Sequence, residues 1–145
     1  MRFALVVSQY HAFVTDGLER GAREVLAEAG IGEESIERLL VPGAFEVPQA
    51  ARQAADTQRF AAVICLGCLI RGETPHFDYI AQAVAHGIMR AAQETGVPMT
   101  FGILTTNTAD EAMARSADGP ANKGREAATA AVEMAELYHR LEDGA

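Results

Sequence analysis

The chain has 145 residues, of which 49% are hydrophobic and 22% charged, with a formal net charge of -8 and a pI near 4.9. A chain of this length can bury one core without metal ions or disulfides, so we expect residues 1–145 to form a single domain. The acidic balance argues against attraction to nucleic acid or an anionic membrane. No apolar run nears the roughly 20 residues that span a bilayer and no signal peptide is evident, which favours a cytoplasmic protein.

The first part of the chain alternates short apolar runs with helical patterns. Residues 3–8 form a nearly continuous apolar run, typical of a strand buried on both faces of a parallel sheet. A helical stripe follows, for which Thr15 is the expected N-cap and Gly30 the closing residue. A second strand is predicted at 37–43, where Pro-Gly ends it, and an alanine-rich helix at 48–57.

The second part continues the alternation. Residues 60–70 form the most apolar predicted strand, which we place at the centre of the sheet. Thr74 is the expected N-cap of the next helix, with Pro75 at its first position, and Gly96 closes that helix. One more strand and two more helices complete the pattern, at residues 99–106, 108–116 and 122–141. Strands alternating with helices predict an α/β fold, a flavodoxin-like three-layer αβα sandwich with a four-stranded parallel sheet.

Cys65 and Cys68 have the C-x-x-C spacing of many redox and metal sites. Both lie inside the apolar run of the third predicted strand, whereas a redox pair normally opens a helix and a zinc site needs two further ligands. We therefore expect two small buried hydrophobic residues and no metal site.

Chemically active side chains follow the predicted strands. In an open α/β sheet the ligand binds outside the carboxyl ends of the strands, so the loops there should converge. Those loops carry aromatic rings, carboxylates, hydroxyl groups and one histidine: Tyr10, Phe45, Glu46, Glu73, Thr74, Thr105, Thr106 and His76. The sequence predicts a ligand site at this edge.

His76 is predicted to be the second residue of a helix. The free N–H groups and positive dipole end of a helix favour an anion and disfavour imidazolium. A neutral His76 could move a proton beside a phosphate held by Thr74 and the backbone from Gly72. The alternative is an exposed first-turn histidine without a role, which the flanking Gly-Glu-Thr-Pro makes less attractive.

Three other residues allow two interpretations each. Phe45 is either a core residue or part of the site. Glu46 either complements a helix dipole or accepts hydrogen bonds from a polyhydroxy ligand. Tyr10 is either a rim aromatic or a face on which a planar heterocycle stacks.

The last third of the chain adds basic residues and one distant aromatic. Arg115 and Lys123 lie on helix rims, where charge is usually just solvated. Phe101 lies early in the fourth strand, at the opposite end of the sheet from the loops, so only a neighbouring subunit could bring it to the site. No dinucleotide-binding, P-loop or zinc-protease motif is present.

Four stretches together resemble one family: VPGAFEVP, GCLIRGETPHFDY, FGILTTNT and NKGREAATAAVEMA. Over almost its whole length the chain resembles the 6,7-dimethyl-8-ribityllumazine synthases of riboflavin biosynthesis. The resemblance implies a condensation of 5-amino-6-(D-ribitylamino)uracil with 3,4-dihydroxy-2-butanone 4-phosphate that releases phosphate and water. It implies no cofactor and no metal.

The resemblance also implies roles for single residues. His76 is the expected catalytic proton-transfer residue, and the butanone phosphate would be held by Glu73, Thr74 and Arg115. The pyrimidine and its ribityl chain would contact Tyr10, Ala44, Phe45, Glu46, Cys68, Leu69, Ile70, Phe101 and Lys123. The stacking position, Tyr10, is more often phenylalanine or tryptophan in the family, and Arg71 receives no role.

The resemblance implies a homo-oligomer with active sites between subunits, to which a neighbour lends Phe101, Arg115 and Lys123. The family forms pentamers, some of which build decamers or sixty-subunit shells. The alternative from another class is a non-catalytic homologue that binds a flavin or lumazine or only forms a shell. A flavodoxin-like FMN carrier is a weaker alternative, because the loop after the first strand lacks a glycine- and hydroxyl-rich phosphate cradle.

Overall fold

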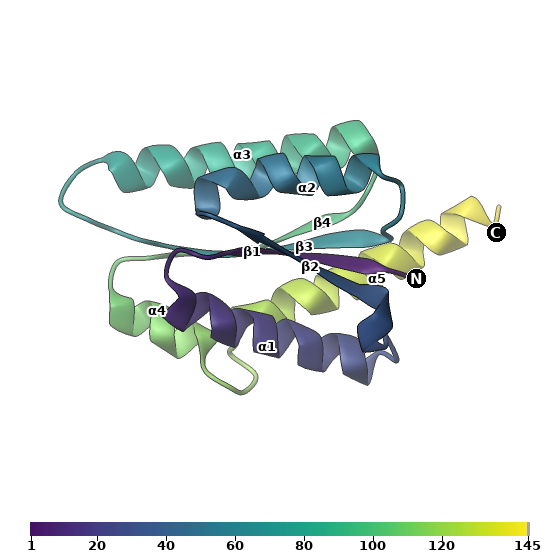
Figure 1. Ribbon diagram of the computed structural model, residues 1–145, viewed down its shortest axis with the longest axis horizontal. Helices are drawn as coiled ribbons and strands as arrows, with labels where there is room; N and C mark the ends of the chain where they lie inside the picture. Colours follow the sequence, from purple (N-terminus) through teal and green to yellow (C-terminus); the bar gives the residue numbers. More distant parts are fainter. Residues whose placement is uncertain (145) are drawn as a thin grey trace.

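The computed structural model describes residues 1–144, in which strands and helices alternate along the chain (Figure 1). The strands are β1 (Phe3–Ser8), β2 (Ile36–Val41), β3 (Ala62–Ile70) and β4 (Met99–Thr106). The helices are α1 (Ala12–Glu28), α2 (Val47–Asp56), α3 (His76–Thr95), α4 (Ala109–Ser116) and α5 (Lys123–Glu142), with short 3₁₀ turns at η1 (Glu33–Ser35) and η2 (Ala44–Glu46). The predicted order of elements is confirmed.

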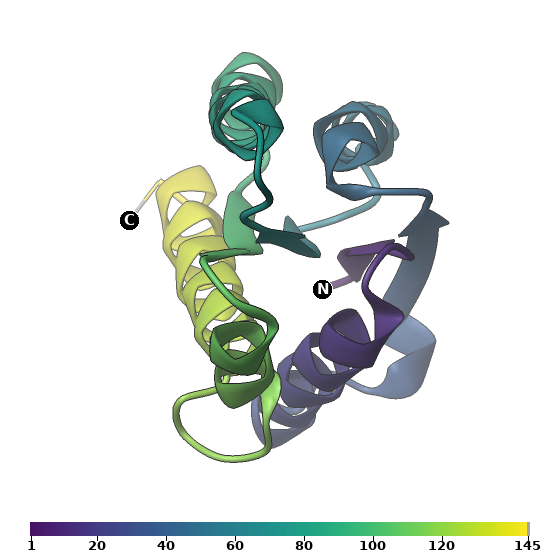
Figure 2. The same cartoon turned by 90° about the vertical axis from the view of Figure 1, so that its left-hand side faces the viewer.

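The four strands form one parallel sheet in the order β2-β1-β3-β4. Helices α2 and α3 cover one face, and α1, α4 and α5 cover the other (Figures 1 and 2). Two apolar cores result, one on each side of the sheet. The flavodoxin-like three-layer fold and the inner position of β3 are confirmed. Figure 2 faces the carboxyl ends of the strands, where the loops into α1, α2, α3 and α4 come together.

The start of α1 differs from the prediction. The N-cap is His11, whose backbone is left-handed with a φ of 63°, and not Thr15, which is buried inside the helix. The carbonyl oxygen of His11 accepts hydrogen bonds from the N–H groups of Val14 at 2.9 Å and Thr15 at 3.0 Å. The helix therefore begins through a backbone turn, and the hydroxyl of Thr15 is not its cap.

The start of α3 is shifted by one residue from the prediction. The N-cap is Pro75 and not Thr74, so His76 is the first residue of the helix. The Thr74 hydroxyl still accepts a 3.4 Å hydrogen bond from the His76 N–H. Gly96 closes the helix with a φ of 74°, as predicted, because glycine adopts this backbone conformation without strain.

Asn122 joins helices α1, α4 and α5, which cover one face of the sheet. Its side-chain oxygen caps α5 by accepting a 3.1 Å hydrogen bond from the Arg125 N–H. Its amide nitrogen donates to the carbonyl oxygens of Gly17 in α1, at 3.0 Å, and of Ser116 at the end of α4, also at 3.0 Å. The side chain is almost fully buried. This junction fixes the ends of α4 and α5, where two of the predicted basic site residues lie.

The two cysteines are free and buried, as predicted. Burial raises the pKa of Cys65 to about 12 and that of Cys68 to about 11, so both thiols stay protonated at neutral pH. Across residues 1–144, none of the helices combines the length and the apolar character that crossing a membrane requires.

Candidate active site

A cavity of about 560 Å³ opens at the carboxyl ends of β1, β2 and β3. The loop after β1, the turn η2, the end of β3 and the first turn of α3 each contribute to its wall. The lining residues are Tyr10, His11, Gly43, Ala44, Phe45, Glu46, Leu69, Ile70, Gly72, Thr74, His76, Phe77 and Ile80. The convergence predicted for three of the four strand-end loops is thus confirmed.

Two aromatic rings at this cavity are open to solvent. Tyr10 is 65% exposed and Phe45 is 60% exposed, so Phe45 is not the core residue that one interpretation of its motif offered. Tyr10 is also stacked on the ring of His11, with ring centres 4.4 Å apart. Partial burial lowers the pKa of His11, which favours its neutral ring. Exposed ring faces beside a cavity suit the binding of a flat heterocycle.

The apolar floor of the cavity comes from the end of β3 and from η2. Leu69 and Ile70 are the last residues of β3, and Ala44 is buried at the start of η2. Glu46 lies beside them with its carboxylate close to Gly43, where an added Cβ would stand 3.1 Å from Oε1 of Glu46. A carboxylate at an otherwise apolar wall can accept hydrogen bonds from hydroxyl groups of a ligand.

Thr74 and His76 lie at the rim, where α3 begins. Both are exposed, and His76 is in the first turn, where its N–H donates to the Thr74 hydroxyl and those of Asp78 and Tyr79 donate to the Pro75 carbonyl oxygen. This part of the cavity therefore combines the positive dipole end of a helix, a hydroxyl group and an imidazole. These groups can hold a phosphate and exchange a proton with a neighbouring ligand atom.

A second hollow of about 330 Å³ lies along the outer edge of β4. Its lining includes Phe101, Thr105, Thr106, Arg115 and Lys123, and it shares no lining residue with the first cavity. Lys123 is paired with Glu126 at 3.1 Å. Arg115 makes no ion pair or side-chain hydrogen bond with any other residue from 1 to 144. The predicted site residues therefore form two groups, and the second group carries a cation with spare donors.

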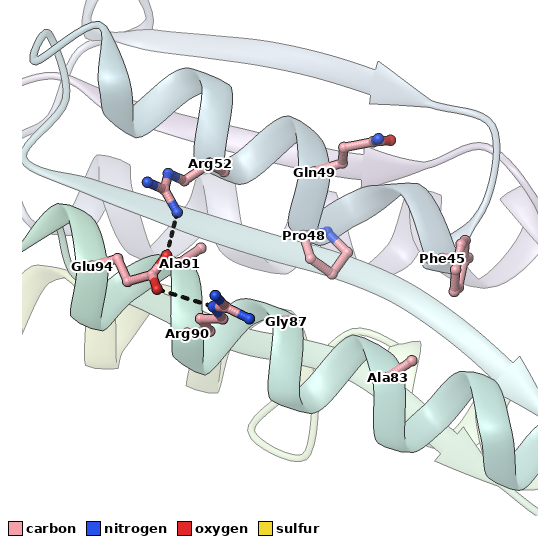
Figure 3. Close-up of a pocket in the computed structure, with 9 residues that line it drawn as sticks. All are labelled: Phe45, Pro48, Gln49, Arg52, Ala83, Gly87, Arg90, Ala91 and Glu94. Carbon is pink, nitrogen blue, oxygen red and sulfur yellow. Dashed lines mark hydrogen bonds and ion pairs between the residues drawn. The ribbon is translucent and has the colours of Figure 1, made fainter.

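A third hollow, of about 460 Å³, lies between α2 and α3 (Figure 3). Glu94 of α3 accepts hydrogen bonds from Arg52 of α2 at 2.6 Å and from Arg90 at 3.0 Å, and these bonds lower the pKa of Glu94. The charged side chains of this groove already pair with one another, so they are less available to bind a ligand than the polar groups of the first cavity. Phe45 lines both and stands between them.

Arg71, to which the sequence assigned no role, contacts the end of β4, the turn that follows it and the first turn of α3. Its backbone N–H donates to the Thr106 carbonyl at 2.9 Å, and its Nε donates to Oδ1 of Asn107 at 3.1 Å. Its two terminal nitrogens approach the Asp78 carboxylate at 3.2 and 3.4 Å. The guanidinium lies 4.6 Å from the ring centre of Phe77. Sequence spacing gave no signal for these contacts.

Comparison with known proteins decides the family. A sequence model of the family described as 6,7-dimethyl-8-ribityllumazine synthase matches residues 1–139. The chain belongs to this family. A relative named 6,7-dimethyl-8-ribityllumazine synthase from Salinibacter ruber is 48% identical over 97% of this chain and 90% of its own length. Another of the same name from Syntrophus aciditrophicus is 44% identical over 97% of this chain and 92% of its own length.

Besides the three residues of the second hollow, two more residues that the family resemblance assigns to the site lie outside the first cavity, Cys68 and Glu73. The side chain of Cys68 is buried in the apolar core between the sheet and helices α1 and α5. This core lies on the opposite face of the sheet from the core beneath α2 and α3. Glu73 is exposed on the loop before α3 and does not line the cavity. Within residues 1–144, no group of three or more histidine, cysteine or acidic residues is arranged to hold a metal ion.

Proposed function

We propose that this protein condenses 5-amino-6-(D-ribitylamino)uracil with 3,4-dihydroxy-2-butanone 4-phosphate. The products are 6,7-dimethyl-8-ribityllumazine, phosphate and water, as a step of riboflavin biosynthesis. Membership of the lumazine synthase family supports the reaction. The observation that carries it in this chain is the cavity in which two open ring faces meet a helix start bearing Thr74 and His76.

The pyrimidine would lie against the exposed rings of Tyr10 and Phe45, over the floor made by Leu69 and Ile70. The Glu46 carboxylate would accept hydrogen bonds from the ribityl chain. Holding a flat ring by stacking and a polyhydroxy chain by hydrogen bonds fixes the reacting amine in one orientation. Ala44 would contribute its backbone and the small side chain that leaves room for the ring. Cys68, buried on the other face, would act through its backbone alone.

The phosphorylated ketone would lie at the start of α3, near Thr74 and Glu73. The primary amine adds to the ketone carbonyl and a first water leaves. Phosphate is then eliminated, which leaves an enol that becomes a second carbonyl, and the ribityl-bearing amine attacks this carbonyl and closes the ring with loss of a second water. His76 would return protons to the departing oxygens, for which general acid–base catalysis typically contributes about 10²- to 10⁴-fold. Orienting the two reactants supplies much of the remaining acceleration. Neither a redox step nor a metal enters this sequence of steps.

Phosphate departure requires positive charge, and the second hollow offers Arg115, whose guanidinium has no ion pair within residues 1–144. We therefore propose that a neighbouring subunit presents its own Arg115, Phe101 and Lys123 to the cavity. The separation of the two groups of lining residues within one chain supports this arrangement. We favour a pentamer, and a measurement of particle size would distinguish it from a decamer or a sixty-subunit shell. The single domain over residues 1–145 and the cytoplasmic location stay predictions.

The first test is turnover. Purified protein is mixed with the two substrates, and lumazine formation is followed by absorbance against the spontaneous reaction. Acceleration is expected, and a rate equal to the blank would favour the non-catalytic binding or shell-forming homologue. His76→Ala should lower kcat by about 10²-fold while leaving pyrimidine affinity within about two-fold, since the ring lies on other residues.

The second test asks whether the site is shared. His76→Ala and Arg115→Ala are each expected to be weakly active, and the two variants are then mixed, dissociated and reassembled. If sites form between subunits, random mixing restores an intact site at about one interface in four, so about a quarter of wild-type activity returns. If one chain holds both residues of a site, mixing restores nothing. Size-exclusion chromatography of every sample shows that both variants still assemble.

A further inference from the structure

Arg71 lies at the base of the loop that carries the proposed proton-transfer residue. Residues 71–75 connect the end of β3 with the start of α3. The side chain of Arg71 crosses this loop and reaches Asp78 in the first turn of α3, while its Nε reaches Asn107 just after β4. One side chain thus connects the ends of two strands with the start of a helix.

The loop has little else to hold it. Residues 71–76 are all exposed, and a side chain added at Gly72 would meet no atom within 4 Å. The Thr74 hydroxyl accepts only a long hydrogen bond, of 3.4 Å, from the His76 N–H. The fork between Arg71 and Asp78 and the stacking of the guanidinium on Phe77 therefore determine much of where this turn lies.

We propose that Arg71 is a positioning residue for the condensation, an inference that rests on the proposed function. By holding Asp78 and Phe77, it sets the direction of the first turn of α3 and places the His76 imidazole against the cavity. Phe77 is itself part of the cavity wall, so the same contact shapes the wall and aligns the neighbouring residue. Arg71 acts through these residues and not on the substrate.

A direct role in phosphate binding fits the geometry less well. Arg71 does not line the cavity, and its Nε and both terminal nitrogens are already engaged. The Asp78 carboxylate also neutralises its charge at 3.2 Å. Arginine fits this position better than lysine, because a planar guanidinium can form the fork, donate from Nε and stack on a ring at the same time.

The chain offers a matched control at the other end of the same strand. Arg59 lies shortly before β3, forms a two-pronged contact with Glu37 at 3.2 and 3.4 Å, and lies 4.7 Å from the ring centre of Phe60. Its side chain is 48% exposed, against 46% for Arg71. Arg59→Met removes the same kinds of contact far from the proposed site.

The test compares Arg71→Met, Arg71→Lys, Asp78→Asn and Arg59→Met in steady-state kinetics and thermal unfolding. A displacement of about 1 Å near the reacting groups can lower a rate about 10²-fold, so we expect Arg71→Met to lower kcat at least 10-fold. The KM for the pyrimidine should stay within about two-fold, and Arg71→Lys should recover part of kcat through its remaining charge. Arg59→Met should change Tm similarly and kcat less than about two-fold.

Asp78→Asn keeps the inference testable if Arg71→Met folds poorly, because it removes the negative charge and one of the two acceptor oxygens of the same fork. It should lower kcat in the same direction, and the double variant should lose less than the product of the two single effects. Equal kcat values in Arg71→Met and Arg59→Met, or a normal kcat in Asp78→Asn, would overturn the positioning role alone. Absence of turnover in the wild type would overturn the proposed function and this role together.

Discussion

Replacing Asn122 by alanine should destabilise the protein more than the loss of an ordinary helix cap does. An N-cap side chain is worth about 1 kcal/mol. The two amide hydrogens of Asn122 also bond to buried carbonyl oxygens, and each such bond contributes about 1 kcal/mol. The expected loss in the free energy of unfolding is therefore about 3 kcal/mol. Asn122→Ser, which keeps a cap oxygen and loses the amide, should lose about 2 kcal/mol.

Urea unfolding followed by far-UV circular dichroism measures these changes, at one fixed protein concentration because assembly contributes to stability. The control is Thr108→Ala, which removes the exposed cap of α4, a 3.1 Å hydrogen bond from the Glu111 N–H, and should lose about 1 kcal/mol. If Asn122→Ala lost no more than Thr108→Ala, the buried amide bonds would carry no net stability. The reasoning about this junction would then be wrong.

Three further predictions concern titration, thiol reactivity and helix packing. The pKa of His11 in the folded protein is lowered from 6.5. Above that pH the His11 ring is neutral in both the folded and the unfolded chain. As the pH falls, the ring is protonated first in the unfolded chain, which lowers the stability of the folded protein. His11→Asn, which tolerates the left-handed backbone, should therefore reduce the fall in Tm between about pH 7.5 and about pH 5.5, and an unchanged fall would refute this. Cys65 and Cys68 should react with a thiol reagent only after denaturation, and rapid labelling of the native protein would contradict their burial. Gly124→Ala would press a methyl group against the backbone of α1 and should lose about 2 kcal/mol, whereas Gly72→Ala, with free space, should lose less than about 1 kcal/mol in the same urea assay.

The fold could be predicted because its strongest signals are local. Parallel strands buried on both faces show as continuous apolar runs, and β3 is the longest of these. Thr108 begins α4 with a hydroxyl cap, and Gly96 ends α3 in a left-handed conformation, and both signals are visible in the sequence. The rule that ligands bind at the carboxyl ends of parallel strands brought Tyr10, Phe45 and His76 together correctly.

The parts that could not be predicted depend on backbone conformation or on distant partners. Histidine is not a common N-cap, and nothing in the sequence showed that the backbone of His11 would start α1. The contact of Arg71 with Asn107 joins residues 36 positions apart, which spacing along one helix or strand cannot reveal. Alternation along β3 does place Cys68 and Leu69 on opposite faces, a signal that could have separated their roles.

The outer edge of β4 has a consequence for solubility. Among residues 1–144, β4 pairs only with β3, so eight residues of backbone are open on its other side. Open strand edges promote aggregation, and proteins usually protect them with lysine, proline or a bulge. Here the edge carries Phe101, which the proposed shared site needs, so replacing it with a protective residue would remove part of that site. A subunit that covers this edge would prevent aggregation, and variants held as monomers should both lose turnover and precipitate more readily.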